Sequence, residues 1–315
     1  MKIIKGIDNY HKDKDSYNVL TIGNFDGIHS GHRAILERVV KEARKRGGKG
    51  IVFTFDPHPI EILFPCLDLK FISSFEEKVG LIKEIGIDEV ICINFDSEFA
   101  EQEPYEFVKS ILWEKVGVKE IIIGKGYTFG KDKKGTVGLL REIGRELHFQ
   151  VEDIKPVTIE RTVVSSSRIR RLLAEGEIKD AARLLGRRYS IEGIIIKGTK
   201  KGRKLGFPTA NISPPSFLSI PKNGVYAVTS EIDKEKVDGV AYIGTQPTFG
   251  QRERNIEVHI INNNFNYNED LYKKRLKVTF IEKLRDEMVF KDKESLIRHI
   301  NIDIKMARDI LVRDK

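Results

Sequence analysis

The chain has 315 residues, enough for two domains of ordinary size. With 40% hydrophobic and 32% charged residues, the composition excludes a disordered protein, and no apolar run approaches the roughly 18 residues that a membrane span needs. The net charge of +8 suits anionic partners without separating nucleic acid from small phosphates. The N-terminus lacks the apolar core of a signal peptide, and the two cysteines have no metal-ligand spacing, so we expect a cytoplasmic protein with reduced thiols.

The first half of the chain alternates short apolar runs with helical patterns. Apolar runs predict buried strands at residues 18–23, 50–55, 89–94 and 119–124. Helical spacing predicts the intervening helices at residues 33–46, 75–85 and 104–116. Because strands separated by helices build a parallel sheet, we expect a Rossmann-like α/β domain that binds its ligand at the carboxyl ends of the strands.

The pattern changes after Gly186. Strand-like segments follow at residues 189–197, 224–232, 237–244, 256–261 and 276–281. With turn residues between them and no long helical pattern, these segments predict an antiparallel barrel or sandwich. Apolar residues recurring at helical spacing from Leu296 to Leu311 predict a closing helix. We place the boundary near Leu185, which gives domains at 1–184 and 185–315.

A glycine- and histidine-rich segment, residues 23–32 with the sequence GNFDGIHSGH, lies where the first predicted strand turns into a helix. Gly27 and Gly31 let the backbone approach a ligand closely, and the helix N-terminus that follows suits a phosphate. His29 and His32 are three residues apart, so we expect them on one face of the first turn. There both imidazoles could donate hydrogen bonds to phosphate oxygens as charge builds in a transition state.

The H-x-G-H core of this segment resembles the nucleotidyltransferase superfamily, and the longer form G-x-F-D-G-x-H-x-G-H resembles its FAD synthetase branch. Residues 164–170, VSSSRIR, resemble the I-S-S-T-x-x-R motif of the same family. The resemblance implies catalytic roles for His29, His32 and Arg170, whose guanidinium supplies fixed charge. It implies ATP binding by Gly23, Phe25, Gly31, Ser165, Ser166 and Ser167. It implies flavin binding by His58, Tyr127 and Phe129, although His58 could instead only shape its loop.

The reaction that this resemblance implies is an in-line attack of a phosphate oxygen on the α-phosphorus of ATP, with release of pyrophosphate. No side-chain nucleophile is needed, because positioning and charge neutralisation carry the catalysis. Mg²⁺ would bridge the phosphates while it keeps several waters.

Residues 197–211, KGTKKGRKLGFPTAN, resemble the riboflavin kinase motif G-x-x-x-G-R-x-L-G-F-P-T-A-N. Glycines and cations at this spacing can form a flexible loop over phosphates. Thr209 and Asn211 offer hard oxygen ligands for Mg²⁺. The resemblance therefore implies that the kinase ATP site contains Gly198, Gly202, Arg203, Thr209 and Asn211.

Residues 255–260, NIEVHI, alternate as a strand with Ile256, Val258 and Ile260 on one face, and Glu257 and His259 on the other. In riboflavin kinases the glutamate matching Glu257 is the base that activates the ribityl hydroxyl, a task that suits a carboxylate. Arg285 fits the family as a residue of the flavin pocket, with a surface salt bridge as the alternative.

The resemblance extends from about Val19 to Arg308 and implies two reactions in one chain. Riboflavin and ATP give FMN and ADP, and then FMN and ATP give FAD and pyrophosphate. Two positions depart from the family pattern, since Gly126 replaces an Asp or Asn and Tyr242 replaces an Asn that many members carry. In the family both positions lie in regions close to the flavin, so the departures bear on the affinity of the protein for flavin.

Two alternatives remain. In the first, one domain is active and the other is retained as a scaffold. In the second, the protein is a basic flavin sensor or nucleic-acid binder, but the sequence contains no recognition helix or RNA-binding motif to support this. We therefore expect neither nucleic acid nor a membrane among the partners.

Overall fold

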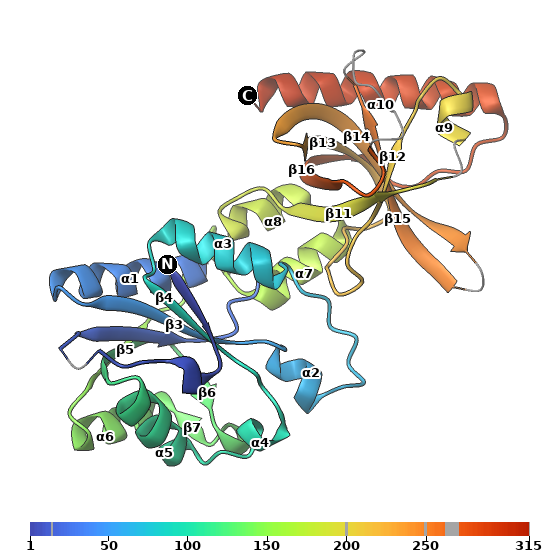
Figure 1. The fold of residues 1–315 in the computed structure, drawn as a ribbon. Coiled ribbons are helices and arrows are strands. Elements are labelled where there is room, and N and C mark those ends of the chain that lie inside the picture. The colour runs from blue at the N-terminus through green and yellow to red at the C-terminus, as the bar shows by residue number, and fades with distance from the viewer. Residues whose placement is uncertain (14, 199–200, 249–250, 262–270, 315) are drawn as a thin grey trace. The chain divides into compact units, whose positions relative to one another are not determined.

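The computed structural model describes residues 1–13, 15–198, 201–248, 251–261 and 271–314, and contacts within it divide the chain into two compact units, Met1–Ser166 and Ser167–Lys315 (Figure 1). The division lies earlier than the predicted boundary near Leu185, because α7 (Ser166–Glu175) and α8 (Ile178–Leu185) pack with the second unit. The backbone N–H of Lys222 donates to the carbonyl of Leu173 at 3.0 Å, and Lys179 pairs with Glu282 at 2.7 Å. The boundary near Leu185 stays a prediction.

The first unit is built on a six-stranded sheet with the strand order β1-β4-β3-β2-β5-β8, and all of its pairs are parallel. Its strands are β1 (Lys2–Lys5), β2 (Asn18–Ile22), β3 (Lys49–Phe55), β4 (Glu89–Ile93), β5 (Val118–Gly124) and β8 (Gln150–Ile154). The predicted Rossmann-like α/β domain is therefore confirmed. In this sheet β3 pairs with one side of β2, and β5 pairs with the other side. The strand order therefore reverses direction at β2, and ligands of such sheets bind at the carboxyl end of the strands at this point.

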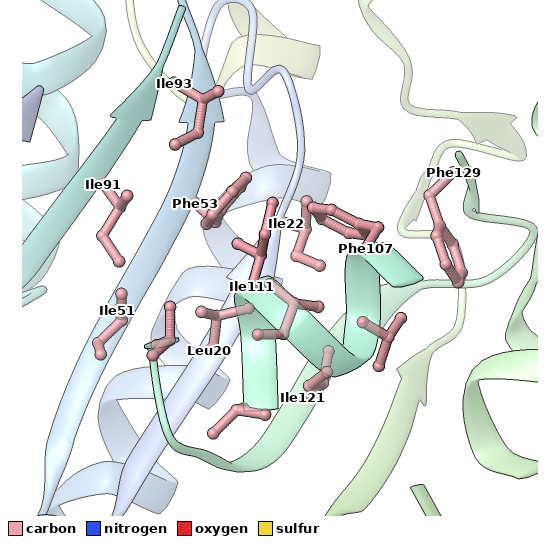
Figure 2. Close-up of a cluster of buried hydrophobic side chains, with 14 of the residues drawn as sticks. Leu20, Ile22, Ile51, Phe53, Ile91, Ile93, Phe107, Ile111, Ile121 and Phe129 are labelled. Carbon is pink, nitrogen blue, oxygen red and sulfur yellow. The ribbon is translucent and has the colours of Figure 1, made fainter. Parts of the chain in front are cut away.

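Helices cover both faces of this sheet. They are α1 (Ser30–Lys45), α2 (Pro59–Leu63), α3 (Phe75–Ile85), α4 (Ser97–Ala100), α5 (Pro104–Glu106), the π-helix η2 (Phe107–Lys115) and α6 (Val137–Glu146). One face buries Leu20 and Phe53 against Phe107 and Ile111 of η2 (Figure 2). Alternate strand residues face the other way and pack against Leu36 and Val39 of α1.

Short elements complete the first unit. They are η1 (Ile7–Asn9), η3 (Lys131–Lys133), and the two-stranded pairs β6 (Thr128–Phe129) with β7 (Gly135–Thr136) and β9 (Thr158–Ile159) with β10 (Thr162–Val163).

The second unit is a closed antiparallel barrel with the strand order β11-β12-β15-β14-β13-β16. Its strands are β11 (Ser190–Ile196), β12 (Ala210–Ser213), β13 (Gly224–Ile232), β14 (Glu235–Thr248), β15 (Gln251–Ile260) and β16 (Arg275–Arg285). Because β11 pairs with both β12 and β16, the structure is a barrel and not a sandwich. A short helix, α9 (Lys201–Lys204), precedes β12.

The predicted C-terminal helix is α10 (Lys293–Arg313), and its residues Ala307 and Leu311 pack on Val225 and Ile281 of the barrel. Among the helices of the described residues, none is long and apolar enough to cross a membrane.

Candidate functional site

The histidine segment, residues 23–32, forms the loop between β2 and α1 together with the first residues of α1, and we call it the histidine loop. His29 is the N-cap of α1, and its Nδ1 accepts a hydrogen bond from the backbone N–H of His32 at 3.2 Å. His29 therefore precedes the helix, whereas the spacing predicted it within the first turn. The two imidazoles are nevertheless adjacent, since their ring centroids lie 3.6 Å apart at 16°. A Cβ on Gly31 would lie 3.1 Å from the His29 ring, so the glycine leaves room for that ring.

Backbone turns and side-chain bonds fix the conformation of this loop. Phe25, Gly27 and Ile28 have left-handed φ angles of 51°, 80° and 35°. The Asp26 carboxylate accepts the backbone N–H of Ile72 at 2.9 Å, while a Cβ on Gly27 would lie 2.7 Å from the Ile72 side chain. The ring of Phe25 meets His32 edge-on at 5.2 Å. The loop is thus held before any ligand binds, as a phosphate site requires.

Gly23 lies at the start of this loop. A Cβ on Gly23 would come within 3.1 Å of the Phe25 ring, so the glycine allows that ring to fold back toward the carboxyl end of β2. Gly23, Phe25, His29, Gly31 and His32 are thereby brought together by the structure.

The serine segment begins beside the histidine loop. Ser166 opens α7, and its hydroxyl donates to the Asp26 carbonyl at 3.0 Å. Ser165 is half-buried and Ser167 is exposed. Ser167 and Arg170 belong to the second contact unit, so their roles at the histidine loop stay predictions.

Sequence reasoning missed Lys78, which lies beneath the histidine loop on α3 and is 8% exposed. Its Nζ donates to the Asn24 carbonyl at 3.2 Å and lies 3.4 Å from the Thr54 hydroxyl. Burial lowers the pKa of Lys78. A signal was present in the sequence, because Lys78 shares the apolar face of the predicted helix with Ile82, four residues later.

His32 is held neutral at ordinary pH. Burial is the main cause that lowers its pKa well below the usual value, and the charges of His29 and Lys78 act in the same direction. Its Nδ1 is buried and has no hydrogen-bond partner within the described part of the chain. The ring is therefore available as a neutral hydrogen-bonding group.

His58 caps α2 and shapes its own loop. Its Nδ1 accepts the backbone N–H of Ile60 at 3.1 Å, and the Glu61 carboxylate accepts the backbone N–H of His58 at 3.0 Å. The ring also contacts Phe71, with centroids 5.0 Å apart. These contacts agree with the alternative in which His58 shapes its loop. Flavin binding by His58 stays a prediction.

Tyr127 and Phe129 stack on each other with centroids 6.0 Å apart at 15°. Phe129 is buried against Phe107 in the core, and burial raises the pKa of Tyr127. Neighbouring Gly126 has a φ of 79°, and a Cβ there would meet no atom within 4 Å. A small side chain at residue 126 would therefore project into open space.

In the second unit the glycines of the kinase motif permit close contacts. A Cβ on Gly198 would lie 2.2 Å from the Asn211 amide nitrogen, and one on Gly202 would lie 2.4 Å from the Phe207 carbonyl. Arg203 is exposed on α9. Thr199 and Lys200 of the motif lie outside the described residues.

A pocket in the barrel unit contains four of the five predicted kinase ATP residues. Its lining residues are Ile195, Ile196, Gly198, Arg203, Pro208, Thr209, Ala210, Asn211, Leu271 and Tyr272. The β11 residues Ile195 and Ile196 were not predicted, because a strand that reads as barrel wall gives no sign that its end also lines a ligand pocket.

Glu257 lies beside this pocket. Ile256, Val258 and Ile260 are buried while Glu257 is half-buried, which confirms the predicted alternation. Strand pairing places Glu257 opposite Asn211 of β12 and Tyr242 of β14. The Thr209 hydroxyl donates to the Glu257 carboxylate at 3.3 Å, and the Asn255 amide donates to the Asn211 oxygen at 2.8 Å.

Arg285 forms an ion pair with Asp303 of α10. Its Nε and a terminal nitrogen reach the two carboxylate oxygens at 3.0 and 2.8 Å. Asp303 is buried, so the pair is less exposed than the surface salt bridge weighed as the alternative. Flavin binding by Arg285 stays a prediction. Nearby, the Tyr242 hydroxyl donates to Glu287, and burial raises the pKa of Tyr242.

Comparison with known proteins agrees with the two-unit architecture. A family model for FAD synthetase matches residues 11–168, and one for riboflavin kinase matches residues 185–311. The chain is 37% identical over 312 residues to the bifunctional riboflavin kinase/FMN adenylyltransferase of Buchnera aphidicola subsp. Schizaphis graminum, covering 98% of each chain. The chain belongs to the bifunctional riboflavin kinase/FMN adenylyltransferase family.

Another family member and one solved structure are also similar along nearly their whole length. The family member of Escherichia coli strain K12 is 34% identical over 310 residues, covering 98% of this chain and 97% of its own. A crystal structure of a macrolide-efflux protein from Streptococcus pneumoniae is 30% identical to this chain in sequence, with a TM-score of 0.88. The match covers 98% of this chain and 99% of that protein.

Proposed function

We propose that this chain makes FMN and then FAD at two separate sites, with ATP as the co-substrate of both reactions. The observation that supports the proposal is that Gly23, Phe25, His29, Gly31 and His32 lie together in the first unit, while four of the five predicted kinase ATP residues line one pocket in the second. The histidine loop lies at the carboxyl end of β2, and Thr209, Asn211 and Glu257 lie together on the barrel.

In the FAD-forming reaction, an FMN phosphate oxygen attacks the α-phosphorus of ATP, the new P–O bond forms, and the bond to pyrophosphate breaks. The protein positions the groups and stabilises the spreading negative charge. Burial lowers the pKa of His32 and so favours its neutral form, in which the imidazole contributes a hydrogen bond. Ser166 and Arg170 would contact the triphosphate.

In the FMN-forming reaction, Glu257 accepts the proton of the ribityl hydroxyl as that oxygen attacks the γ-phosphorus of ATP. The bond to the β-phosphate oxygen breaks and ADP leaves. The 3.3 Å bond from Thr209 orients the carboxylate from the side of the ATP pocket. A base placed within reach of the attacking hydroxyl is the requirement of this step.

The residues present fit a magnesium ion in the kinase site. Thr209 and Asn211 bring two hard oxygen atoms next to Glu257, and the described residues contain no cluster of three or more His, Cys, Asp or Glu that could hold a metal by itself. Such a donor set suits Mg²⁺, which takes its other ligands from substrate phosphates and water. When bound, the ion supplies charge neutralisation for the transferring phosphoryl group.

The test is a chromatographic time course with riboflavin, ATP and Mg²⁺, and a parallel reaction that contains a chelator. FMN should appear before FAD, and the chelator should stop both steps. A protein that binds flavin without consuming ATP would contradict the proposal. A cytoplasmic location is a further prediction, tested by cell fractionation.

A further inference from the structure

Lys78 is a buried cation whose contacts are with uncharged groups. Its ammonium reaches the Asn24 carbonyl and the Thr54 hydroxyl and lies 5.2 Å from the Phe75 ring centroid. In the described part of the chain, no carboxylate forms an ion pair with it. A buried ammonium is costly unless a negative charge neutralises it, so this environment implies that a ligand supplies that charge.

His32 gives a second and independent sign of a ligand. Its Nδ1 is buried without a hydrogen-bond partner among the described residues, at the loop whose Asn24 carbonyl accepts from Lys78. Buried polar atoms are almost always satisfied, so an unsatisfied one beside a rigid loop indicates an absent partner. Burial is the main cause that lowers the pKa of His32, and the charges of His29 and Lys78 act in the same direction.

The other titratable groups around Lys78 do not replace a ligand. Asp26 is occupied by the backbone N–H groups of Ile72 and Ser73. Cys92 does not neutralise Lys78, because burial raises the pKa of its thiol to about 11, while Asp26 and Asp56 act on the ammonium through their charge. These carboxylates favour the charged form of Lys78, and its ammonium can stabilise a bound anion.

We propose that Lys78 is a second fixed cation of the FAD-forming site, besides the predicted Arg170, and stabilises the negative charge of a phosphate group bound at the loop of residues 23–29. The inference rests on the proposed function. It gives the imidazole and the ammonium at this loop different roles. His32 contributes a hydrogen-bonding imidazole, and Lys78 supplies positive charge. Placed in a dry site, a fixed charge costs no reorganisation during the reaction.

The test replaces Lys78 by Met, which keeps the length of the side chain and removes the charge. Lys83→Met is the matched control, because Lys83 is an exposed residue of the same helix. In Lys78→Met, kcat for FAD formation from added FMN should fall by about 100-fold. FMN formation from riboflavin should be unchanged. Lys83→Met should match the parent in both reactions.

Thermal unfolding without ligand separates this role from a structural one. Since the substitution removes a buried charge, Lys78→Met should melt at the parent temperature or above it. A variant that makes FAD at the parent rate would overturn the inference. A variant whose melting temperature falls together with its activity would also overturn the inference. That result would show that Lys78 acts structurally, by linking Asn24 to Thr54 through its hydrogen bonds. If the parent itself forms no FAD, the proposed function fails instead.

Discussion

His32 combines three properties that make it the residue of the histidine loop most open to test. It stacks on His29, its pKa is lowered by burial, and its Nδ1 has no partner within the described residues. His32→Ala should reduce FAD formation by on the order of 100-fold, as the loss of one transition-state donor does. FMN formation should remain near the parent rate. Equal loss of both activities, measured in separate assays, would contradict the two-site assignment.

Glu257→Gln keeps the shape of the side chain and removes the base. We expect FMN formation from riboflavin to collapse, while FAD formation from added FMN survives. Glu235→Gln provides the control, because Glu235 is exposed on the neighbouring strand β14. Phosphorylation of riboflavin by Glu257→Gln at close to the parent rate would show that another group takes the proton.

Gly126 offers a test of flavin affinity. Its φ of 79° favours glycine, but asparagine tolerates this region better than most residues, and an added side chain would meet no atom within 4 Å. One new hydrogen bond to the flavin ring would lower KM for FMN in the FAD-forming reaction by up to about tenfold. Because the bond acts on ground and transition states alike, kcat should change little. An unchanged KM in Gly126→Asn would show that the flavin already has this partner.

At the scale of elements, the sequence predicts best where local signals agree. The predicted helix at residues 75–85 is confirmed as α3, which begins after the Ser74 cap and ends at Gly86 with a left-handed φ of 99°. The strand predicted at residues 224–232 is confirmed as β13. The helix predicted from Arg33 begins at Ser30 instead, because the His29 side chain supplies the cap.

Short or polar strands escaped prediction. β1 has four residues, β8 carries Glu152 and Asp153, and β12 begins at the end of the kinase motif. Their positions depend on pairing with distant strands, which no local pattern encodes. Lys78 was also missed: its place four residues before Ile82 is a local sign of burial, but its contact with Asn24 depends on how α3 packs in the fold.

The Arg285–Asp303 pair joins β16 to α10 and should matter for stability. Asp303→Ala leaves a mostly buried guanidinium without its carboxylate, which should destabilise the barrel unit by about 3 kcal/mol. Calorimetry should show a lower melting temperature for this unit, whereas Asp309→Ala, an exposed change on the same helix, should have little effect. Equal melting temperatures for the two variants would show that the pair contributes nothing.

At the scale of the whole molecule, the two sites use the same ligand as product and substrate. A mixture of His32→Ala and Glu257→Gln should therefore restore FAD formation from riboflavin, since the first variant makes FMN and the second adenylylates it. Each variant alone should form almost no FAD from riboflavin. If the mixture also fails, while each variant retains its own single reaction, FMN does not pass between molecules through solution.

Barrel closure depends on the pairing of β11 with β16, which are separated by most of the second unit. During synthesis the parallel sheet of the first unit has all six strands once residue 154 has left the ribosome, but the barrel cannot close before residue 279 follows. Domains fold in the order in which they emerge, so the FAD-forming sheet can be complete on a nascent chain that has no kinase. A truncated or stalled translation product that extends past Arg170 would then need FMN made by its full-length neighbours.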